Sequence, residues 1–348
     1  MIIFKFANQI LLLELGKGGV VVVVGWYLPE LYPKFRKQEE SINSSWEVDS
    51  DPQAGKGFPI NFSVHYSMAL TEAKNVVAPL MNIVKFKGMS ILQQLHLEER
   101  LFRTSSDNWC IINDGTNAPT IVMGVSGKPS ELLDIKLVLQ DKVPVVRRFT
   151  GGGTVVVDPG TIFVTFICNK DAVPSVELYP RPIMSWSGLI YEDVFRGIAD
   201  FHLRENDYVF GDRKFGGNAQ SISRRRWIHH TSFLWDYEVR NMAYLKVPRR
   251  APDYRSARSH VEFVCHMKDY MSTSDFIDRT VKAVGTRFSL TPMQLEEGNI
   301  HGKTAFDHSS RLLTKAELEA AFASQTNLYG ESTGLSQVQV DLKHVQSN

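Results

Sequence analysis

Apolar residues recur every three or four positions in several stretches of the chain. This spacing places them on one face of a helix. It predicts helices over residues 90–103, 131–139, 187–203 and 275–284. Near the end of the chain, the capping box Thr314-Lys315-Ala316-Glu317 predicts one more short helix.

Short runs rich in β-branched and aromatic residues lie between these stretches and predict strands. The runs are residues 109–112, 120–123, 144–146, 154–157, 208–210 and 227–237. Strand pairs mixed with separate helices favour an α+β fold over a doubly wound parallel one. We therefore expect a mixed β-sheet flanked by helices.

The first eighty residues differ from the rest of the chain. Val20–Leu28 is strongly apolar, but no run of eighteen apolar residues exists, so no transmembrane helix is expected. The start also lacks the character of a transit or signal peptide. Residues 39–58 are polar and are typical of a linker. We divide the chain into an extension of unknown role (1–80), a main domain (81–290) and a tail with one helix (291–348).

Composition narrows the classes of function. The chain has 348 residues and a net charge of +1, which argues against a nucleic-acid binder with a strong electrostatic footprint. Its three cysteines, Cys110, Cys168 and Cys265, are widely spaced. They indicate neither a disulfide framework nor a zinc site, and no other metal-ligand spacing is present.

Candidate chemistry begins at a glycine-rich segment, Arg147-Arg148-Phe149-Thr150-Gly151-Gly152-Gly153. Three glycines between two β-branched runs predict a strand–turn–strand hairpin whose backbone can approach a bound group closely. Successive N–H groups in such a turn can bind an anion, and Arg148 has a donor geometry suited to phosphate. The residues needed for a P-loop or for a dinucleotide fingerprint are absent. The simpler alternative is a flexible turn with solvated arginines.

A second segment, Gly211-Asp212-Arg213-Lys214-Phe215-Gly216-Gly217, places a lysine beside another glycine pair. An ammonium at such a turn can act as a point charge for a carbonyl oxygen and a phosphate, although a lone lysine is usually an ordinary surface charge. His229 and His230 follow in a predicted strand, so their side chains face opposite ways. A structural histidine is expected for at least one of them.

Together, in this order, the segments resemble the lipoate–protein ligase family of the lipoate/biotin ligase superfamily. The similarity extends from about residue 82 to residue 290 and looks closest to the plant lipoate–protein ligase A-like branch. The family's adenylate-binding stretch matches at Arg147, Arg148, Thr150, Gly151, Gly152, Gly153, Val155, Asp158 and Gly160. Its lysine motif matches at Gly211, Asp212, Lys214, Gly217 and Ala219, and its His-His motif at His229 and His230. Residues 245–248 and 254–260 look like the family's later loop.

The resemblance implies an activity. Lipoate or octanoate would react with ATP, accompanied by Mg²⁺, to give an acyl-AMP, and the acyl group would pass to a lysine of an acceptor domain as an amide. Lys214 would be the catalytic residue, bridging the acyl carbonyl and the phosphate. The expected ligand-binding residues are Arg148, Gly151, Gly152, Gly153, Thr154, Val155, Val156, Asp158, Gly217, Ala219 and His230.

Three departures from the family pattern leave alternatives open. Val157 stands where many members have histidine, and Thr231 replaces a glycine. The tail is too short for the accessory domain of many bacterial ligases, so an ATP-independent octanoyl or lipoyl transferase is the second hypothesis. Such an enzyme could use Cys265 as nucleophile, whereas an inert buried thiol is the ordinary interpretation. A non-catalytic relative that only binds lipoyl domains is a third, and biotin ligation fits the motifs less well.

The expected partners also follow from the resemblance. They are the lipoyl domains of 2-oxoacid dehydrogenase E2 subunits and the glycine cleavage H protein, with no nucleic acid and no membrane. Basic residues at 224–226, 249–250, 255 and 258 could form a landing surface for an acidic acceptor domain, or could simply be solvated. A monomer is expected, in mitochondria by resemblance and otherwise in the cytoplasm.

Overall fold

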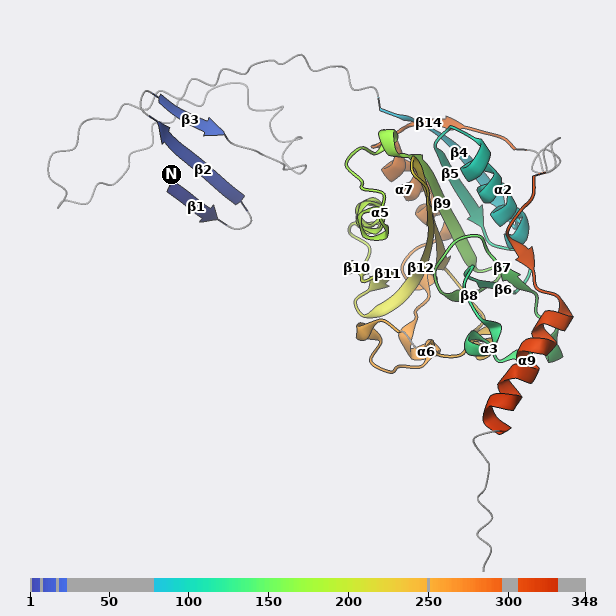
Figure 1. Cartoon of the computed structure of the whole chain (residues 1–348). Coiled ribbons are helices and arrows are strands. Elements are labelled where there is room, and N and C mark those ends of the chain that lie inside the picture. Colours follow the sequence, from blue (N-terminus) through green and yellow to red (C-terminus); the bar gives the residue numbers. More distant parts are fainter. Residues whose placement is uncertain are drawn as a thin grey trace, which may run out of the picture. The chain divides into compact units, whose positions relative to one another are not determined.

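The computed structural model describes residues 2–6, 9–16, 19–23, 78–248, 251–295 and 306–330. The chain divides into two compact units, Met1–Glu72 and Ala73–Asn348 (Figure 1). In the first unit, β1 (Ile2–Phe6), β2 (Gln9–Gly16) and β3 (Gly19–Val23) form an antiparallel meander. The predicted linker at residues 39–58 lies outside the described residues.

An eight-stranded sheet organises the second unit. Its order is β10-β11-β12-β13-β9-β5-β4-β14. The strands are β4 (Leu80–Lys87), β5 (Trp109–Asp114), β9 (Thr161–Asn169), β10 (Phe201–Arg204), β11 (Asp207–Phe210), β12 (Arg213–Ile222), β13 (Arg226–Leu234) and β14 (Ser289–Pro292). β4 pairs in parallel with β5 and β14, and the other neighbours are antiparallel. The predicted mixed sheet is therefore confirmed.

Helices cover both faces of this sheet. Successive strand residues point to opposite faces, so Cys110 and Ile112 of β5 join the core beneath α5 (Pro180–Phe195) and α7 (Thr273–Gly285). Ile111, between them, joins a second apolar cluster with Leu97 of α2 (Ile91–Thr104). In Figure 1, α5 and α7 accordingly lie on one side of the strands and α2 on the other.

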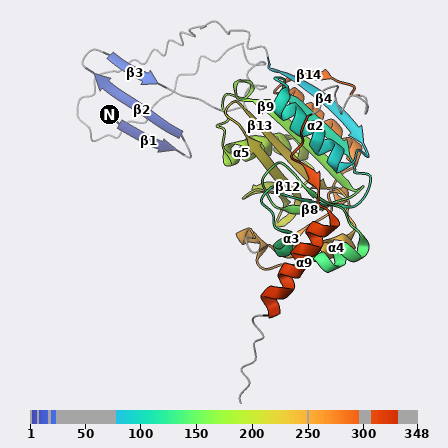
Figure 2. The same ribbon diagram turned by 45° about the vertical axis from the view of Figure 1, so that its right-hand side comes forward.

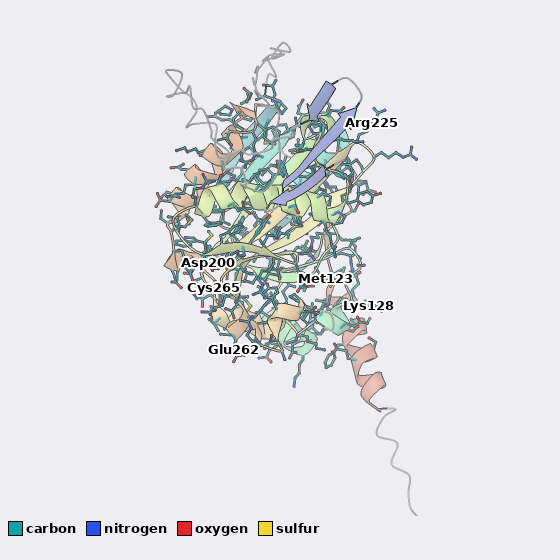
Figure 3. The ribbon with its side chains drawn as sticks, turned by 90° about the vertical axis from the view of Figure 1, so that its left-hand side faces the viewer. Met123, Lys128, Asp200, Arg225, Glu262 and Cys265 are labelled. Atoms are coloured by element: carbon teal, nitrogen blue, oxygen red, sulfur yellow. The ribbon has the colours of Figure 1, made fainter. Side chains whose placement is uncertain are left out.

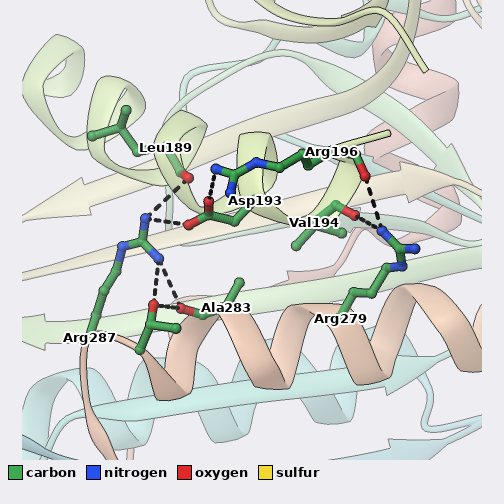
Figure 4. A network of polar contacts seen from close by, with 8 residues as sticks. Leu189, Asp193, Val194, Arg196, Arg279, Ala283 and Arg287 are labelled. Carbon is green, nitrogen blue, oxygen red and sulfur yellow. Dashed lines mark hydrogen bonds and ion pairs between the residues drawn. The ribbon is translucent and has the colours of Figure 1, made fainter. Parts of the chain in front are cut away.

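Arginines of the α7 region tie that helix to the end of α5 (Figure 4). Arg279 donates to the carbonyl oxygen of Val194 at 3.1 Å, and Arg287 donates to that of Leu189 at 3.2 Å and to Asp193 at 2.8 Å. Carbonyls in the last turn of a helix have no partner within the helix. Arg279 therefore satisfies one such carbonyl, that of Val194, while Arg287 contacts α5 one turn earlier.

A smaller sheet carries the glycine segment. Its order is β15-β7-β6-β8, with β6 (Thr120–Met123), β7 (Val145–Arg147), β8 (Thr154–Val157) and β15 (Arg311–Leu312). The hairpin prediction is wrong in one respect: β7 and β8 are not paired, because β6 lies between them, parallel to β7 and antiparallel to β8. The glycine segment therefore passes over the end of β6, where Val125 N donates to Thr150 O at 3.0 Å.

The C-terminal segment packs against this smaller sheet. β15 pairs with β7 through Arg311↔Arg147 and Leu312↔Val146. α9 (Lys315–Gly330) then contacts α3 (Pro129–Leu132) and α4 (Ile135–Asp141), as Figure 2 shows. The predicted capping box is confirmed, since Glu317 N donates to Thr314 Oγ1 and Thr314 N donates to the Glu317 carboxylate.

Hydrogen bonds join the start of this segment to α2. The buried Glu99 carboxylate accepts the N–H groups of Ser309 and Ser310 at 3.0 and 3.1 Å, and Ser310 Oγ accepts Phe149 N at 3.0 Å. Phe149 directly follows Arg148, so the segment holds the chain just before the glycine residues.

Several predicted boundaries are corrected. The helix predicted over 187–203 is α5, which begins at Pro180 and ends at Phe195; Gly197 then adopts φ +75° and residues 201–204 become β10. The helix predicted over 131–139 is divided into α3 and α4, because Leu133 is extended. The strand predicted to Tyr237 ends at Leu234, and α9 is longer than expected.

The remaining elements are short. They are the 3-10 helices η1 (Lys170–Ala172), η2 (Val239–Tyr244), η3 (Asp253–Arg255) and η4 (Met267–Asp269), and the helix α6 (His260–Phe263). Within the part of the chain that the structure describes, no helix combines the length and the apolar character needed to cross a membrane.

Candidate active site

A cavity of about 720 Å³ is lined by strands of both sheets, by α2 and by residues between Met242 and Val264. Of the ligand-binding and catalytic residues predicted from the sequence, all but Asp158 line it. They are Arg148, Gly151, Gly152, Gly153, Thr154, Val155, Val156, Lys214, Gly217, Ala219 and His230. The two segments that the sequence singled out are therefore walls of the same cavity.

The conformation of the glycine segment requires glycine at its centre. Gly152 has φ +108°, and a Cβ there would lie 2.8 Å from Arg148 Nη2. Gly124, at the end of β6, is equally restricted, because its Cβ would lie 2.3 Å from Gly152 O. A Cβ on Gly153 would meet nothing within 4 Å. The segment is thus a tightly packed turn at Gly152 and open on the side of Gly153.

Arg148 fixes the conformation of this turn by hydrogen bonds to it. Its side chain is buried, with Nε donating to Thr150 Oγ1 at 2.9 Å and Nη2 donating to the carbonyl oxygens of Gly151 and Gly153 at 3.0 and 2.9 Å. Burial lowers the pKa of Arg148 to about 10, and the nearby Glu98 opposes that shift. The contact with phosphate expected from the sequence stays a prediction; the contacts present fix the shape of the turn.

His230 connects the turn to α2 through Glu98, a residue that sequence analysis missed. His230 Nε2 lies 3.3 Å from Thr150 Oγ1, and its Nδ1 lies 2.9 Å from Glu98 Oε2. Glu98 is completely buried and also accepts from Gln94 and Thr165 at 2.7 and 2.6 Å. A buried polar network whose members are all satisfied is rigid, so it holds this wall of the cavity in place.

Lys214 enters the cavity from β12. Its Nζ lies 2.7 Å from Asp207 Oδ1, and its side chain is 26% exposed against 11% for that of Asp207. Asp207, the first residue of β11, also lines the cavity and was missed by the sequence analysis. The ammonium therefore lies within reach of a ligand and is already paired with a carboxylate.

The sequence suggested that the glycine pair beside Lys214 forms a turn, but the pair lies within a strand. Gly216 and Gly217 are paired in β12 with Phe233 and Ser232 of β13. A Cβ on Gly216 would lie 3.0 Å from the ring of Tyr208, which explains the glycine there. A Cβ on Gly217 would meet Lys214 Nζ at 3.5 Å, so glycine keeps the space around the ammonium open.

An apolar wall completes the cavity. Ile91 and Leu95 come from successive turns of α2, and Val122 and Phe163 come from the two sheets. These four belong to one buried apolar cluster. The cavity thus combines a polar end, with the glycine turn and Lys214, and a wall suited to an aliphatic chain.

Asp158 lies outside the cavity, and its carboxylate accepts hydrogen bonds from the surrounding chain. Its Oδ1 accepts from Gly160 N and Thr161 Oγ1 at 3.1 and 3.2 Å, and its Oδ2 accepts from Glu238 N at 3.2 Å and Asn241 Nδ2 at 3.3 Å. Both oxygens serve to fix the turn after β8. Ligand binding by Asp158 is therefore not supported by its place in the structure.

The departures at Val157 and Thr231 are accommodated in the core. Val157 is buried in the cluster around Ile91 and Leu95. Thr231 is also buried and donates to Asn218 Oδ1 at 2.6 Å. Both residues are therefore part of the scaffold around the cavity.

His229 and Cys265 are also structural. His229 is fully buried, and its pKa is lowered to about 3 by burial and by His230, so its imidazole is neutral. Burial raises the pKa of the Cys265 thiol to about 11, and Cys265 does not line the cavity. These observations weigh against Cys265 as a nucleophile, because the thiolate is the reactive form.

Two residues of the later loop, Arg255 and His260, also line the cavity. Arg255 is 3% exposed and lies 4.8 Å from the centre of the Phe263 ring, while its Nη2 has no hydrogen-bond partner among the described residues. The pKa of the neighbouring His260 is lowered by burial and then by Arg255. Sequence analysis assigned this loop to the family but gave these two residues no role at the site.

The expected basic landing surface is divided by the fold. Arg255 is buried and Arg258 is paired with Asp212 at 3.1 Å, so neither presents a free cation. Arg225 is exposed and extends from the core away from Glu262 and Cys265 (Figure 3). Residues 249 and 250 lie outside the described residues. Those basic residues that the structure describes therefore form no continuous patch.

No group of three or more potential metal ligands occurs among the described residues.

Comparison with known proteins agrees with this geometry. Residues 90–289 match the family model described as the lipoyl protein ligase A/B catalytic domain. The "Inactive lipoate–protein ligase 2" of Plasmodium falciparum is 26% identical over 275 residues, which cover 61% of this chain and 71% of that protein. The "Probable lipoate-protein ligase A" of Mycoplasma pneumoniae is 29% identical over 192 residues, covering 53% of this chain and 55% of that protein.

Solved structures share the fold at low identity. A lipoate-protein ligase A bound with ATP aligns with a TM-score of 0.52 and 16% identity, over 64% of this chain and 92% of its own. A bi-partite lipoate protein ligase from Thermoplasma acidophilum, solved in a study with its E2 lipoyl domain, aligns with a TM-score of 0.52 and 17% identity, over 64% of this chain and 90% of its own.

Proposed function

Because the chain belongs to the lipoyl protein ligase A/B catalytic-domain family, we propose that it is a lipoate–protein ligase. In this proposal it activates lipoate or octanoate with ATP to an acyl-AMP. It then transfers the acyl group to the ε-amine of an acceptor-domain lysine as an amide.

One observation carries the proposal: the glycine turn, Lys214 and an apolar wall line the same cavity. A medium-chain acid needs apolar contact along its tail and a cation at its carboxylate. The residues also fit a nucleotide phosphate, since the turn is open beside Gly153, where a Cβ would meet nothing within 4 Å, and Thr154 Oγ1 is buried without a partner among the described residues.

The two half-reactions place charge at the same end of the cavity. In the first, a carboxylate oxygen of the acid bonds to the α-phosphorus of ATP, and the bond to pyrophosphate breaks. In the second, the acceptor amine bonds to the acyl carbon, AMP leaves with the bonding electrons, and the amine loses a proton. Preorganised donors stabilise such developing charge. Lys214 and the backbone N–H groups of residues 152–156 would supply them.

Several finer assignments belong to this proposal. Mg²⁺ would accompany ATP and bind through phosphates and water, as it usually does. Lipoyl domains of E2 subunits would be acceptors, consistent with the E2 lipoyl domain named with the Thermoplasma ligase. The H protein as a further acceptor, a monomeric state, a mitochondrial location and the plant-like branch are expectations from the resemblance.

Two alternatives have a specific basis. An ATP-independent transferase is the second hypothesis from the sequence, but a role for Cys265 in it is opposed by burial and by the raised thiol pKa. A non-catalytic role has support in the name of the Plasmodium relative, which is called inactive. The first experiment must therefore separate ligase, transferase and binder.

The test is intact-mass analysis of an apo lipoyl domain incubated with the purified chain. One set of reactions contains lipoate or octanoate with and without Mg-ATP, and a parallel set contains an octanoyl carrier protein. We expect modification from the free acid only with Mg-ATP. Modification from the carrier alone would favour the transferase, and none in either set would favour a binding role.

Lys214→Ala tests the catalytic assignment. Loss of the ammonium should lower acyl transfer by at least about a hundredfold, a loss typical of removing a charge-stabilising group, with no change in the melting temperature. The matched control is Lys268→Ala, because Lys268 also pairs with an aspartate, Asp236, at 2.9 Å but does not line the cavity. Full activity in folded Lys214→Ala would remove Lys214 from the mechanism.

A further inference from the structure

Residues 251–265 lie against the strand that carries Lys214. Cys265 N donates to Lys214 O at 2.9 Å, and Val264 forms an isolated parallel bridge with Lys214. Arg213 donates through Nε and Nη2 to Val264 O at 3.1 and 2.7 Å. The backbone of Lys214 and the side chain of Arg213 are therefore both fixed to this segment.

A side-chain contact joins the same two parts at the cavity. Asp207 shares its carboxylate: Oδ1 is 2.7 Å from Lys214 Nζ, and Oδ2 accepts from the Tyr254 hydroxyl at 2.8 Å. The pKa of Tyr254 is raised by burial and by Asp207, so the phenol stays protonated and remains a donor. Each oxygen of the Asp207 carboxylate thus has its own partner, Lys214 for Oδ1 and Tyr254 for Oδ2.

The segment holds Tyr254 firmly. The Arg204 guanidinium lies 4.7 Å from the centre of the Tyr254 ring, and Arg258 Nη2 donates to Tyr254 O at 2.8 Å. Beyond it, Ser256 and Ala257 have φ values of +51° and +58°. Such left-handed conformations cost energy in residues other than glycine and persist where surrounding contacts determine them. The position of the Tyr254 hydroxyl is therefore set by the segment.

We propose that Tyr254 is a positioning residue for Lys214, acting through Asp207. Its hydroxyl fixes the orientation of the Asp207 carboxylate, and the carboxylate directs the ammonium into the cavity. The position of residues 251–265 and that of the ammonium are then coupled, so displacement of the segment would release Lys214. This inference rests on the proposed function only for its effect on catalysis.

A double-mutant cycle tests the coupling. Tyr254→Phe removes the hydroxyl and keeps the ring, and Asp207→Asn keeps the size of the side chain. If Tyr254 acts through Asp207, Tyr254→Phe should slow acyl-adenylate formation about tenfold, as expected for one hydrogen bond to a charged group. In the Asp207→Asn background it should cost nothing further. The loss should appear in kcat, with the KM for the acid unchanged.

Chemical labelling of Lys214 in the same variants measures the coupling without relying on catalysis. Amines are acylated briefly with a lysine-directed reagent, and the Lys214 peptide is quantified by mass spectrometry against the Lys268 peptide. Tyr254→Phe and Asp207→Asn should each raise labelling of Lys214 several-fold, and the double variant should add nothing. The matched control is Tyr244→Phe. Tyr244 does not line the cavity, and the variant also loses a tyrosine–aspartate hydrogen bond, to Asp141 at 2.9 Å, so it should change neither readout.

The outcomes are distinct. Additive losses, or wild-type labelling in Tyr254→Phe, would overturn the proposal. If the wild-type chain forms no acyl-adenylate, the proposed function fails, and the labelling cycle alone decides on Tyr254. If Asp207→Asn does not fold, labelling of Tyr254→Phe against Tyr244→Phe decides, since a merely structural tyrosine would leave Lys214 unchanged.

Discussion

His229 and His230 are neighbours on β13 and contact different sides of the sheet. His229 lies near Tyr208, with its Nδ1 3.0 Å from Gln220 Nε2, while His230 meets Glu98 of α2. The opposite orientation expected from the strand is confirmed. Both rings are buried, however, so a solvent-facing histidine does not occur at this pair.

His229 should make stability depend on pH. Its pKa is about 3 in the folded chain against 6.5 for an unperturbed histidine, so below pH 6.5 the unfolded chain takes up a proton that the folded chain does not. Stability is therefore lost as the pH falls from 6.5 towards 3, by up to about 1.4 kcal/mol per unit from this residue. The free energy of unfolding, measured with urea between pH 6.5 and 5, should change less with pH for His229→Gln than for the wild-type chain. An equal change with pH in both would contradict the lowered pKa of His229.

Gly152 and Gly153 should differ sharply in tolerance to a methyl group. Gly152→Ala combines a positive φ with a contact of 2.8 Å to Arg148 Nη2, whereas a Cβ at Gly153 meets nothing within 4 Å. We expect Gly152→Ala to cost about 1–3 kcal/mol of stability and to weaken ATP binding. Gly153→Ala is the control for stability. Thermal unfolding and calorimetric titration with ATP measure both effects, and equal behaviour of the two variants would exclude this account of the turn.

The sequence predicted one half of the site better than the other. Gly152 and Lys214 lie in local motifs, and the motifs are visible without the fold. Glu98 has no such signal, because its partner His230 is 132 positions away. Arg148 was recognised, but which groups its donors contact depends on how the chain turns back over β6. Local pattern finds the residue, and only packing determines its partners.

At the scale of elements, apolar spacing alone misplaced a helix end. Ile198 and Phe201 continue the helical spacing of Ile190 and Val194, and all four pack in or against one core. Gly197, at φ +75°, ends the helix before them. The residues are apolar because they are buried, not because they are helical, so periodicity could not distinguish helix α5 from strand β10.

Ser310, which directly precedes β15, should support the glycine turn. Ser310→Ala removes the acceptor of Phe149 N, a buried group, and should cost about 1–3 kcal/mol. Because Phe149 lies next to Arg148, ATP affinity should fall as well. The control is Ser324→Ala, since Ser324 is exposed and donates only within α9, to Ala321 O. Urea unfolding and ATP titration compare the two variants, and unchanged values for Ser310→Ala would show that the Ser310–Phe149 hydrogen bond does not support the turn.

At the scale of the whole molecule, every residue lining the cavity belongs to the unit Ala73–Asn348. The predicted α+β fold and family are confirmed there, while the expected domain limits at 81 and 290 stay predictions. The family resemblance predicted the fold of this unit correctly because the motifs that carry it all lie in this unit and in the family's order. It gave no information on the first unit, which contains none of them.

The second unit should fold without the first. We expect residues 73–348 to melt at the same temperature as the full chain and to modify a lipoyl domain equally well. A chain beginning at residue 91 is the matched control, because it lacks β4, which lies between β5 and β14. Circular dichroism and intact-mass analysis measure folding and activity. A large drop in melting temperature on removing residues 1–72 would show that the two units depend on each other.

The position of β15 also has a consequence for neighbouring molecules. It covers the outer side of β7, where Val146 and Arg147 pair with Leu312 and Arg311. A strand left open at the side of a sheet offers its backbone groups to any other chain. A chain cut before residue 306 would therefore tend to self-associate through β7. We therefore expect β15 to limit association between molecules as well as to complete the smaller sheet.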